Sequence, residues 1–150
     1  MLGGVAAATA LFYALRSRSP ELRATFEEQD RRERERIEHG AALYAAHCAE
    51  CHGNRLEGQP GWEHRKTDGT YPAPPHDETG HTWHHPDWQL FSIVELGGQA
   101  TARPNFPSNM PAFGDKLSDD DIRAVLTFIK SRWPPEIRHR QEKANQGRHP

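Results

Sequence analysis

The residues of this chain best suited to chemistry are Cys48, Cys51 and His52. Two cysteines separated by two residues and followed directly by a histidine form the attachment pattern of a c-type haem. Each thiol adds to one porphyrin vinyl group as a thioether, and one helical turn between the thiols spans the fixed distance between the two vinyls. The next residue then points its imidazole at the iron. The pattern therefore predicts covalent haem with His52 as an iron ligand.

Two other kinds of site share a Cys-x-x-Cys pair, namely a redox dithiol and half of a structural zinc site. The chain has only 2 cysteines, so it offers no second pair for zinc. A thioredoxin-like dithiol would lie in a βαβ setting, and no strand-rich pattern surrounds Cys48 and Cys51. Both observations favour haem attachment and leave the redox dithiol as the alternative.

Haem iron bound by one histidine needs a sixth ligand, and Met110 is the chain's only methionine besides the initiator. It lies in a proline-containing loop just before a predicted helix. A thioether is a soft ligand that favours ferrous iron and raises the reduction potential. Methionines more often fill gaps in a core, but no apolar periodicity surrounds this one. We therefore predict that Met110 is the second axial ligand.

Three motifs, in order along the chain, resemble those of a known family. They are Gly40-x-x-x-Tyr44-x-x-x-Cys48-x-x-Cys51-His52-Gly53, then Met110-Pro111-x-Phe113, then Leu117-Ser118-Asp119 opening a last helix. Together they resemble a small monohaem cytochrome c of the His/Met-ligated type, over residues 37–133. The resemblance implies an all-α fold of few helices wrapped around one covalent haem c, and a role in electron transfer.

The resemblance also implies a partner for the iron-binding histidine. In small cytochromes c, a proline in the loop after the haem motif directs its carbonyl to the free ring nitrogen of that histidine. This bond fixes the orientation of the imidazole. Pro74 and Pro75, within Pro72-Ala73-Pro74-Pro75, match this place best, and the choice between them stays open here.

Helical periodicity predicts the elements that position these residues. An apolar face leads from Ile37 through Gly40 to Tyr44 and the haem motif, and residues 86–96 form a short helix closed by two glycines. Ser118 with Asp121 resembles a capping box that opens a helix stopped by Pro134 and Pro135.

Glycine inside a helix costs about 1 kcal/mol relative to alanine, so Gly40 is expected to mark a close helix crossing. In the family resembled, the first and last helices cross at a glycine and an aromatic. Gly40 with Val125 and Phe128 occupies that place here. Three further aromatic residues are expected either beside the haem or in the core: Trp83, Trp88 and Phe106.

The chain divides by composition into four stretches. Residues 1–16 contain an apolar run of 14 residues, shorter than the roughly 20 of a transmembrane helix. We interpret it as a signal-peptide core or an uncleaved anchor. Residues 17–36 are a charged linker or helical stalk, 37–133 the cytochrome c domain and 134–150 a C-terminal tail. Covalent haem is attached outside a bacterial inner membrane, so we expect the periplasmic side, anchored or secreted.

Charge constrains the partners. The whole chain carries −2, and residues 40–133 hold 8 basic and 12 acidic groups. An acidic body argues against nucleic acid, which requires a basic face. It fits docking to a basic patch on a redox partner. The hydrophobic fraction of 35% is low for a globular domain, as expected if a cofactor supplies part of the core.

Four histidines lie within ten residues: His76, His81, His84 and His85. Imidazoles this close could bind copper or zinc, although no fixed-spacing metal motif joins them. They could equally be loop residues that bind haem propionates or water, and one of them could replace Met110 on the iron.

The function expected is electron transfer rather than enzyme catalysis, because two protein ligands would leave no open iron position for a substrate. Two alternatives remain at this stage. The chain could be a cytochrome c subunit of a larger dehydrogenase or oxidase, or a haem sensor or peroxidase with a labile distal ligand.

Overall fold

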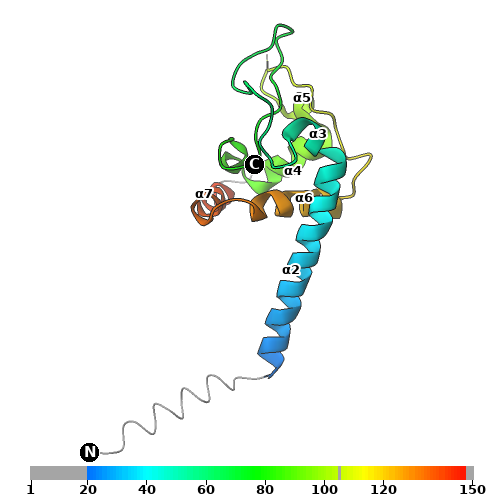
Figure 1. Cartoon of the computed structure of the whole chain (residues 1–150), viewed down its shortest axis with the longest axis vertical. Coiled ribbons are helices and arrows are strands. Elements are labelled where there is room, and N and C mark those ends of the chain that lie inside the picture. The colour runs from blue at the N-terminus through cyan, green and yellow to red at the C-terminus, as the bar shows by residue number, and fades with distance from the viewer. Residues whose placement is uncertain (1–19, 105, 148–150) are drawn as a thin grey trace, which may run out of the picture. The chain divides into compact units, whose positions relative to one another are not determined.

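The computed structural model describes residues 20–104 and 106–147 (Figure 1). These residues form helices joined by loops, with no strand in this part of the chain. The elements are α2 (Pro20–His47), α3 (Ala49–His52), the 3-10 helix η1 (Thr82–His84), α4 (Asp87–Leu96), α5 (Gly98–Thr101), α6 (Asp119–Ser131) and α7 (Pro135–Asn145). The predicted all-α class is confirmed.

The described residues divide into two compact units at the boundary between Glu35 and Arg36. Of the first unit the structure describes residues 20–35, which belong to α2. Their charged side chains pair along the helix surface: Glu28 accepts bonds of 2.6 Å from Arg31 and Arg32. Such exposed pairs stabilise a helix only weakly, as expected of a solvated segment.

The apolar stretch from Leu2 to Leu15 lies outside the described residues, so the predicted signal or anchor stays a prediction. Within the described ranges, no helix combines the length and the apolar character needed to cross a membrane.

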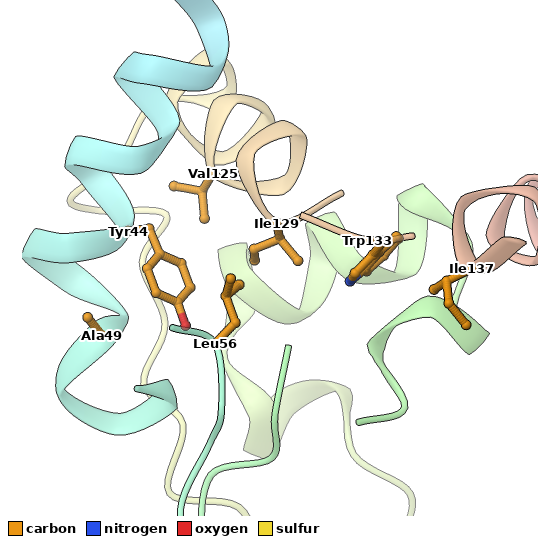
Figure 2. Close-up of a cluster of buried hydrophobic side chains, with 7 residues drawn as sticks. All are labelled: Tyr44, Ala49, Leu56, Val125, Ile129, Trp133 and Ile137. Atoms are coloured by element: carbon orange, nitrogen blue, oxygen red, sulfur yellow. The ribbon is translucent and has the colours of Figure 1, made fainter. Parts of the chain in front are cut away.

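The second unit is built around two apolar clusters that share α6. In the first, side chains from α2, α3, the following loop, α6 and α7 meet (Figure 2): Tyr44, Ala49, Leu56, Val125, Ile129, Trp133 and Ile137. The second joins α4, the Met110 loop and α6: Leu90, Phe113, Leu117, Ile122 and Leu126. Because α6 contributes to both clusters, the haem motif and the Met110 loop pack against the same helix.

The crossing predicted at Gly40 is present. A Cβ atom at this position would overlap the carbonyl oxygen of Ala124 and lie 3.0 Å from Cβ of Phe128. One turn further along α2, the ring of Tyr44 contacts that of Phe128 at a centroid distance of 5.4 Å. The closest approach therefore involves the backbone of Ala124, while Val125 packs in the first cluster.

The start of α6 also agrees with the sequence. The Ser118 hydroxyl accepts a bond from the Asp121 backbone N–H at 3.2 Å, and the Asp121 carboxylate accepts from the Ser118 N–H at 3.1 Å. This reciprocal capping box satisfies two N–H groups that a helix start otherwise leaves unpaired.

The sequence did not indicate a helix in the C-terminal stretch, residues 134–150. This stretch contains α7, which packs against η1 and buries Ile137 and Gln141. Proline is tolerated in the first turn of a helix, so α7 can begin at Pro135, a few residues after α6 ends at Ser131. The Gln141 amide donates to the Asp87 carboxylate at 2.6 Å and thereby ties α7 to the start of α4.

Candidate functional site

Cys48 and Cys51 lie on the turn between the end of α2 and α3. Backbone bonds of 2.9 Å from the Cys48 N–H to the Tyr44 carbonyl, and from the His52 N–H to the Cys48 carbonyl, keep this segment helical. The Tyr44 hydroxyl also donates to the Gly53 carbonyl at 3.1 Å and closes the segment onto α2. The two thiols therefore lie one helical turn apart.

Both cysteines are free thiols, Cys48 half-buried and Cys51 exposed. Burial, with a smaller contribution from Cys51, raises the pKa of Cys48 to about 11. The Cys48 thiol is therefore not activated as the attacking thiol of a redox dithiol, which has a lowered pKa. This argues against the redox dithiol, the alternative kept open by the sequence.

His52 is buried, with 7% of its surface exposed. Its Nδ1 lies 2.9 Å from the Pro74 carbonyl oxygen, to which the protonated nitrogen donates. Burial lowers the pKa of His52, and the bond to Pro74 partly opposes this. The imidazole is therefore neutral, with Nδ1 occupied, so Nε2 is the nitrogen that could bind a metal.

The structure distinguishes between the two candidate prolines. The carbonyl of Pro74 accepts the bond from His52, while that of Pro75 accepts one from the Thr82 hydroxyl at 3.3 Å. Pro75 is instead a fully buried packing residue.

His76 lies against His52 and is not an exposed loop residue. The two rings are stacked, with centroids 3.9 Å apart and planes inclined by 19°. His76 is half-buried, but its Nδ1 is shielded from solvent and has no hydrogen-bond partner. Burial holds the pKa of His76 well below its ordinary value. The sequence indicated only a loop rich in histidines, so this contact was missed.

Met110 lies on the loop between α5 and α6, half-buried against the second apolar cluster. Its carbonyl accepts from the Gly98 N–H at 3.0 Å, and its own N–H donates to the Ser108 hydroxyl at 3.3 Å. The loop is thus tied through its backbone to the junction of α4 and α5.

The other three histidines make separate contacts. His81 stacks on Trp62 and has its edge toward His85, both at centroid distances of 5.5 Å, while His84 contacts Trp83 at 3.7 Å. Among the residues that the structure describes, no group of three or more His, Cys, Asp or Glu side chains could hold a metal ion. The structure therefore lends no support to a second metal site.

The aromatic residues weighed as haem neighbours differ in burial. Trp83 packs against the first apolar cluster, whereas 39% of Trp88 and 44% of Phe106 are exposed. Phe106 stacks on Tyr71 with centroids 4.8 Å apart. Trp83 is thus partly a core residue, and the other two lie at the surface.

The donors present fit a covalently bound haem. Two unpaired thiols lie one turn apart, and the adjacent imidazole has its second nitrogen held by a carbonyl. Together they satisfy the Cys-x-x-Cys-His pattern in structure as well as in sequence.

The family model described as Cytochrome c matches residues 37–133, well over half of the chain. The chain therefore belongs to the cytochrome c family, whose members bind haem c covalently and transfer electrons. A cytochrome c domain is generally an electron carrier. Comparisons with curated proteins and with solved structures gave no significant match.

Proposed function

We propose that this protein is a one-electron carrier with a single haem c, bound through Cys48 and Cys51 and ligated by His52 and Met110. The geometry of His52 is the observation that supports this most directly. The ring is buried, its Nδ1 donates to Pro74 and its Nε2 is available to a metal. A bound haem supplies the reversible ferric/ferrous couple.

The chain's own residues set how that couple behaves. The bond from His52 to Pro74 fixes the imidazole and raises its basicity. The soft Met110 thioether favours ferrous iron and so raises the reduction potential. If His52 and Met110 both hold the iron, no iron position would remain for a substrate, which favours a carrier over an enzyme.

The partners proposed are redox proteins with basic docking patches, because residues 40–133 carry 12 acidic against 8 basic groups. The location proposed is the periplasmic side of a bacterial inner membrane, where covalent haem is attached. Recovery of the full-length protein in the cytoplasm, without haem, would contradict it.

Covalent attachment is tested by extracting the denatured holoprotein with acidified acetone. We expect the haem to stay with the polypeptide, with the pyridine haemochrome spectrum of a haem bearing two thioethers. Cys48→Ala and Cys51→Ala should each give the spectrum of a single thioether. Free extraction of haem from the wild-type protein would refute the proposal.

Met110 is tested by the weak red charge-transfer band that sulfur ligation gives ferric haem. Met110→Ala should abolish the band, lower the reduction potential and let cyanide bind, because it opens an axial position. His81→Leu and His84→Leu serve as controls and should keep the band. If the wild-type protein lacks the band and binds cyanide readily, the haem sensor or peroxidase becomes the better hypothesis.

A further inference from the structure

The parallel contact between His76 and His52 is a feature that the proposed electron-carrier function does not explain. The centroids lie 3.9 Å apart and the planes are nearly parallel, at 19°. The edge of the Tyr44 ring faces His76 on another side, at a centroid distance of 6.0 Å and 68°. The His76 ring thus contacts both the candidate iron ligand and a residue of α2.

The backbone of His76 is held from both directions. Its N–H donates to the Leu56 carbonyl at 2.8 Å, and its carbonyl accepts from the Trp133 indole N–H at 2.7 Å. Leu56 and Trp133 both belong to the first apolar cluster. The position of the His76 ring is therefore set by the core and not by the loop alone.

Filling of the core is a poor explanation for a histidine at this position. The buried Nδ1 of His76 has no partner, and an unpaired buried polar atom destabilises the folded state. An aliphatic residue of similar volume would avoid that loss. What an aliphatic side chain cannot reproduce is a flat ring parallel to the imidazole of His52.

Two contacts at right angles hold His52. The bond from Nδ1 to the Pro74 carbonyl acts at the edge of the ring, whereas the stacked ring of His76 lies against its face. The first leaves tilting and rotation of the ring plane partly free, and the second restricts them. Partners of metal-binding histidines commonly tune the metal through such control of orientation.

We propose that His76 is a positioning residue that fixes the ring plane of His52 by stacking and thereby tunes the reduction potential. The inference rests on the proposed function, since it presupposes that His52 binds haem iron. His76 is neither one of the residues proposed to bind the haem nor the hydrogen-bond acceptor of His52, which is Pro74.

The test compares replacements of His76 in the holoprotein. His76→Phe keeps a flat ring, whereas His76→Leu and His76→Met keep apolar volume without one. The flexible methionine adapts to irregular space and secures a second folded variant without a ring. His84→Leu, which removes an exposed histidine of the nearby η1, is the control.

The measurements are the haem methyl proton shifts of the ferric protein, which report the plane of the axial imidazole, and the reduction potential. We expect the leucine and methionine variants to shift both, and the phenylalanine variant to restore the wild-type methyl pattern. The control should match the wild type in both.

The inference is overturned if the leucine or methionine variant shows wild-type methyl shifts and potential and differs only in thermal stability. A failure of the proposed function is distinguished from this outcome because it would be visible in the wild-type protein. That protein would then lack covalent haem or the charge-transfer band from sulfur ligation.

Discussion

The two regions proposed to bind the iron, the haem motif and the Met110 loop, are built differently. His52 ends a helical turn, is 7% exposed, donates to Pro74 and stacks on His76. Met110 lies on a non-helical loop, is half-buried, and is held chiefly by backbone bonds to its neighbours and to Gly98. One ligand is held through its side chain and the other through its backbone.

The difference matches the chemistry of the two ligands. An imidazole bonds through one nitrogen in its plane, so its orientation matters and is controlled by partners of the ring. A thioether on a flexible side chain needs mainly to be brought to the right place. We therefore expect ligand exchange to begin at Met110, because loop segments open at lower free-energy cost than packed helices.

Each region also depends on a glycine with positive φ. One lies against the backbone of the Met110 loop, and the other lies against the backbone of the loop whose Pro74 carbonyl accepts from His52. Gly97, at φ 83° and ψ 159°, lies against residues 110–112, and Gly58, at φ 68°, lies against residues 73–75. Two other glycines with similar φ, Gly61 and Gly69, have nothing within 4 Å of the position that a Cβ atom would take. The chain thus supplies a matched control for each region.

Gly97→Ala should have the largest effect on iron ligation. Its backbone conformation is nearly restricted to glycine, at a cost of about 1–3 kcal/mol for other residues. The new Cβ would also lie 2.8 Å from the Ala112 nitrogen and 3.1 Å from the Met110 oxygen. We expect a loss of about 2–5 kcal/mol in unfolding free energy, a weaker sulfur band and faster cyanide binding.

The control for this region is Gly69→Ala, at φ 84° with open space around it. It should lose about 1–2 kcal/mol of stability through strain alone and keep the sulfur band. An equal loss of the band in both variants would show that global destabilisation, and not displacement of the Met110 loop, is responsible.

Gly58→Ala should act on the other region with a smaller effect on ligation. Its Cβ would lie 2.5 Å from the Pro75 nitrogen and 2.7 Å from the Pro74 carbonyl carbon. Relief of this overlap moves the carbonyl away from His52, so the imidazole becomes less basic and the reduction potential rises. Stability should fall by about 2–4 kcal/mol, while the sulfur band persists.

For Gly58→Ala, the reduction potential is measured by redox titration of the holoprotein and the stability by its thermal unfolding. Gly61→Ala, at φ 71° with free space, should lose only about 1–2 kcal/mol and leave the potential unchanged. If the reduction potential rose equally in Gly61→Ala, displacement of the Pro74 carbonyl would not be the cause of the rise in Gly58→Ala.

The features that the sequence predicted correctly depend on short segments. The capping box of Ser118 and Asp121 needs only residues three apart, and the helix over residues 87–96 ends at a glycine, as its pattern indicates. The crossing at Gly40 was found because glycine within an otherwise periodic helix needs an explanation. In each case the sequence signal is local, although the crossing at Gly40 joins α2 to the distant Ala124 of α6.

The features that were missed depend on distant residues. The backbone of His76 is held by Trp133, 57 residues away, whose indole N–H donates to its carbonyl. Helix α7 was read as a tail because only Ile137 and Gln141 face inward, and one of them is polar. The choice of Pro74 over Pro75 rests on which carbonyl faces His52, a difference of one residue that composition and periodicity cannot resolve.

Pro74→Ala should have the smallest effect, because His52 donates to the backbone carbonyl of Pro74 and not to its side chain. Alanine retains that carbonyl, and the following Pro75 keeps residue 74 in an extended conformation. We expect a loss of about 0.4–1 kcal/mol through greater freedom of the unfolded chain, with the potential and haem methyl shifts unchanged. Pro75→Ala, which removes part of a fully buried ring, should lose more stability than Pro74→Ala. A rise in potential in Pro74→Ala comparable to that of Gly58→Ala would mean that the proline ring, and not its carbonyl alone, is needed to hold His52.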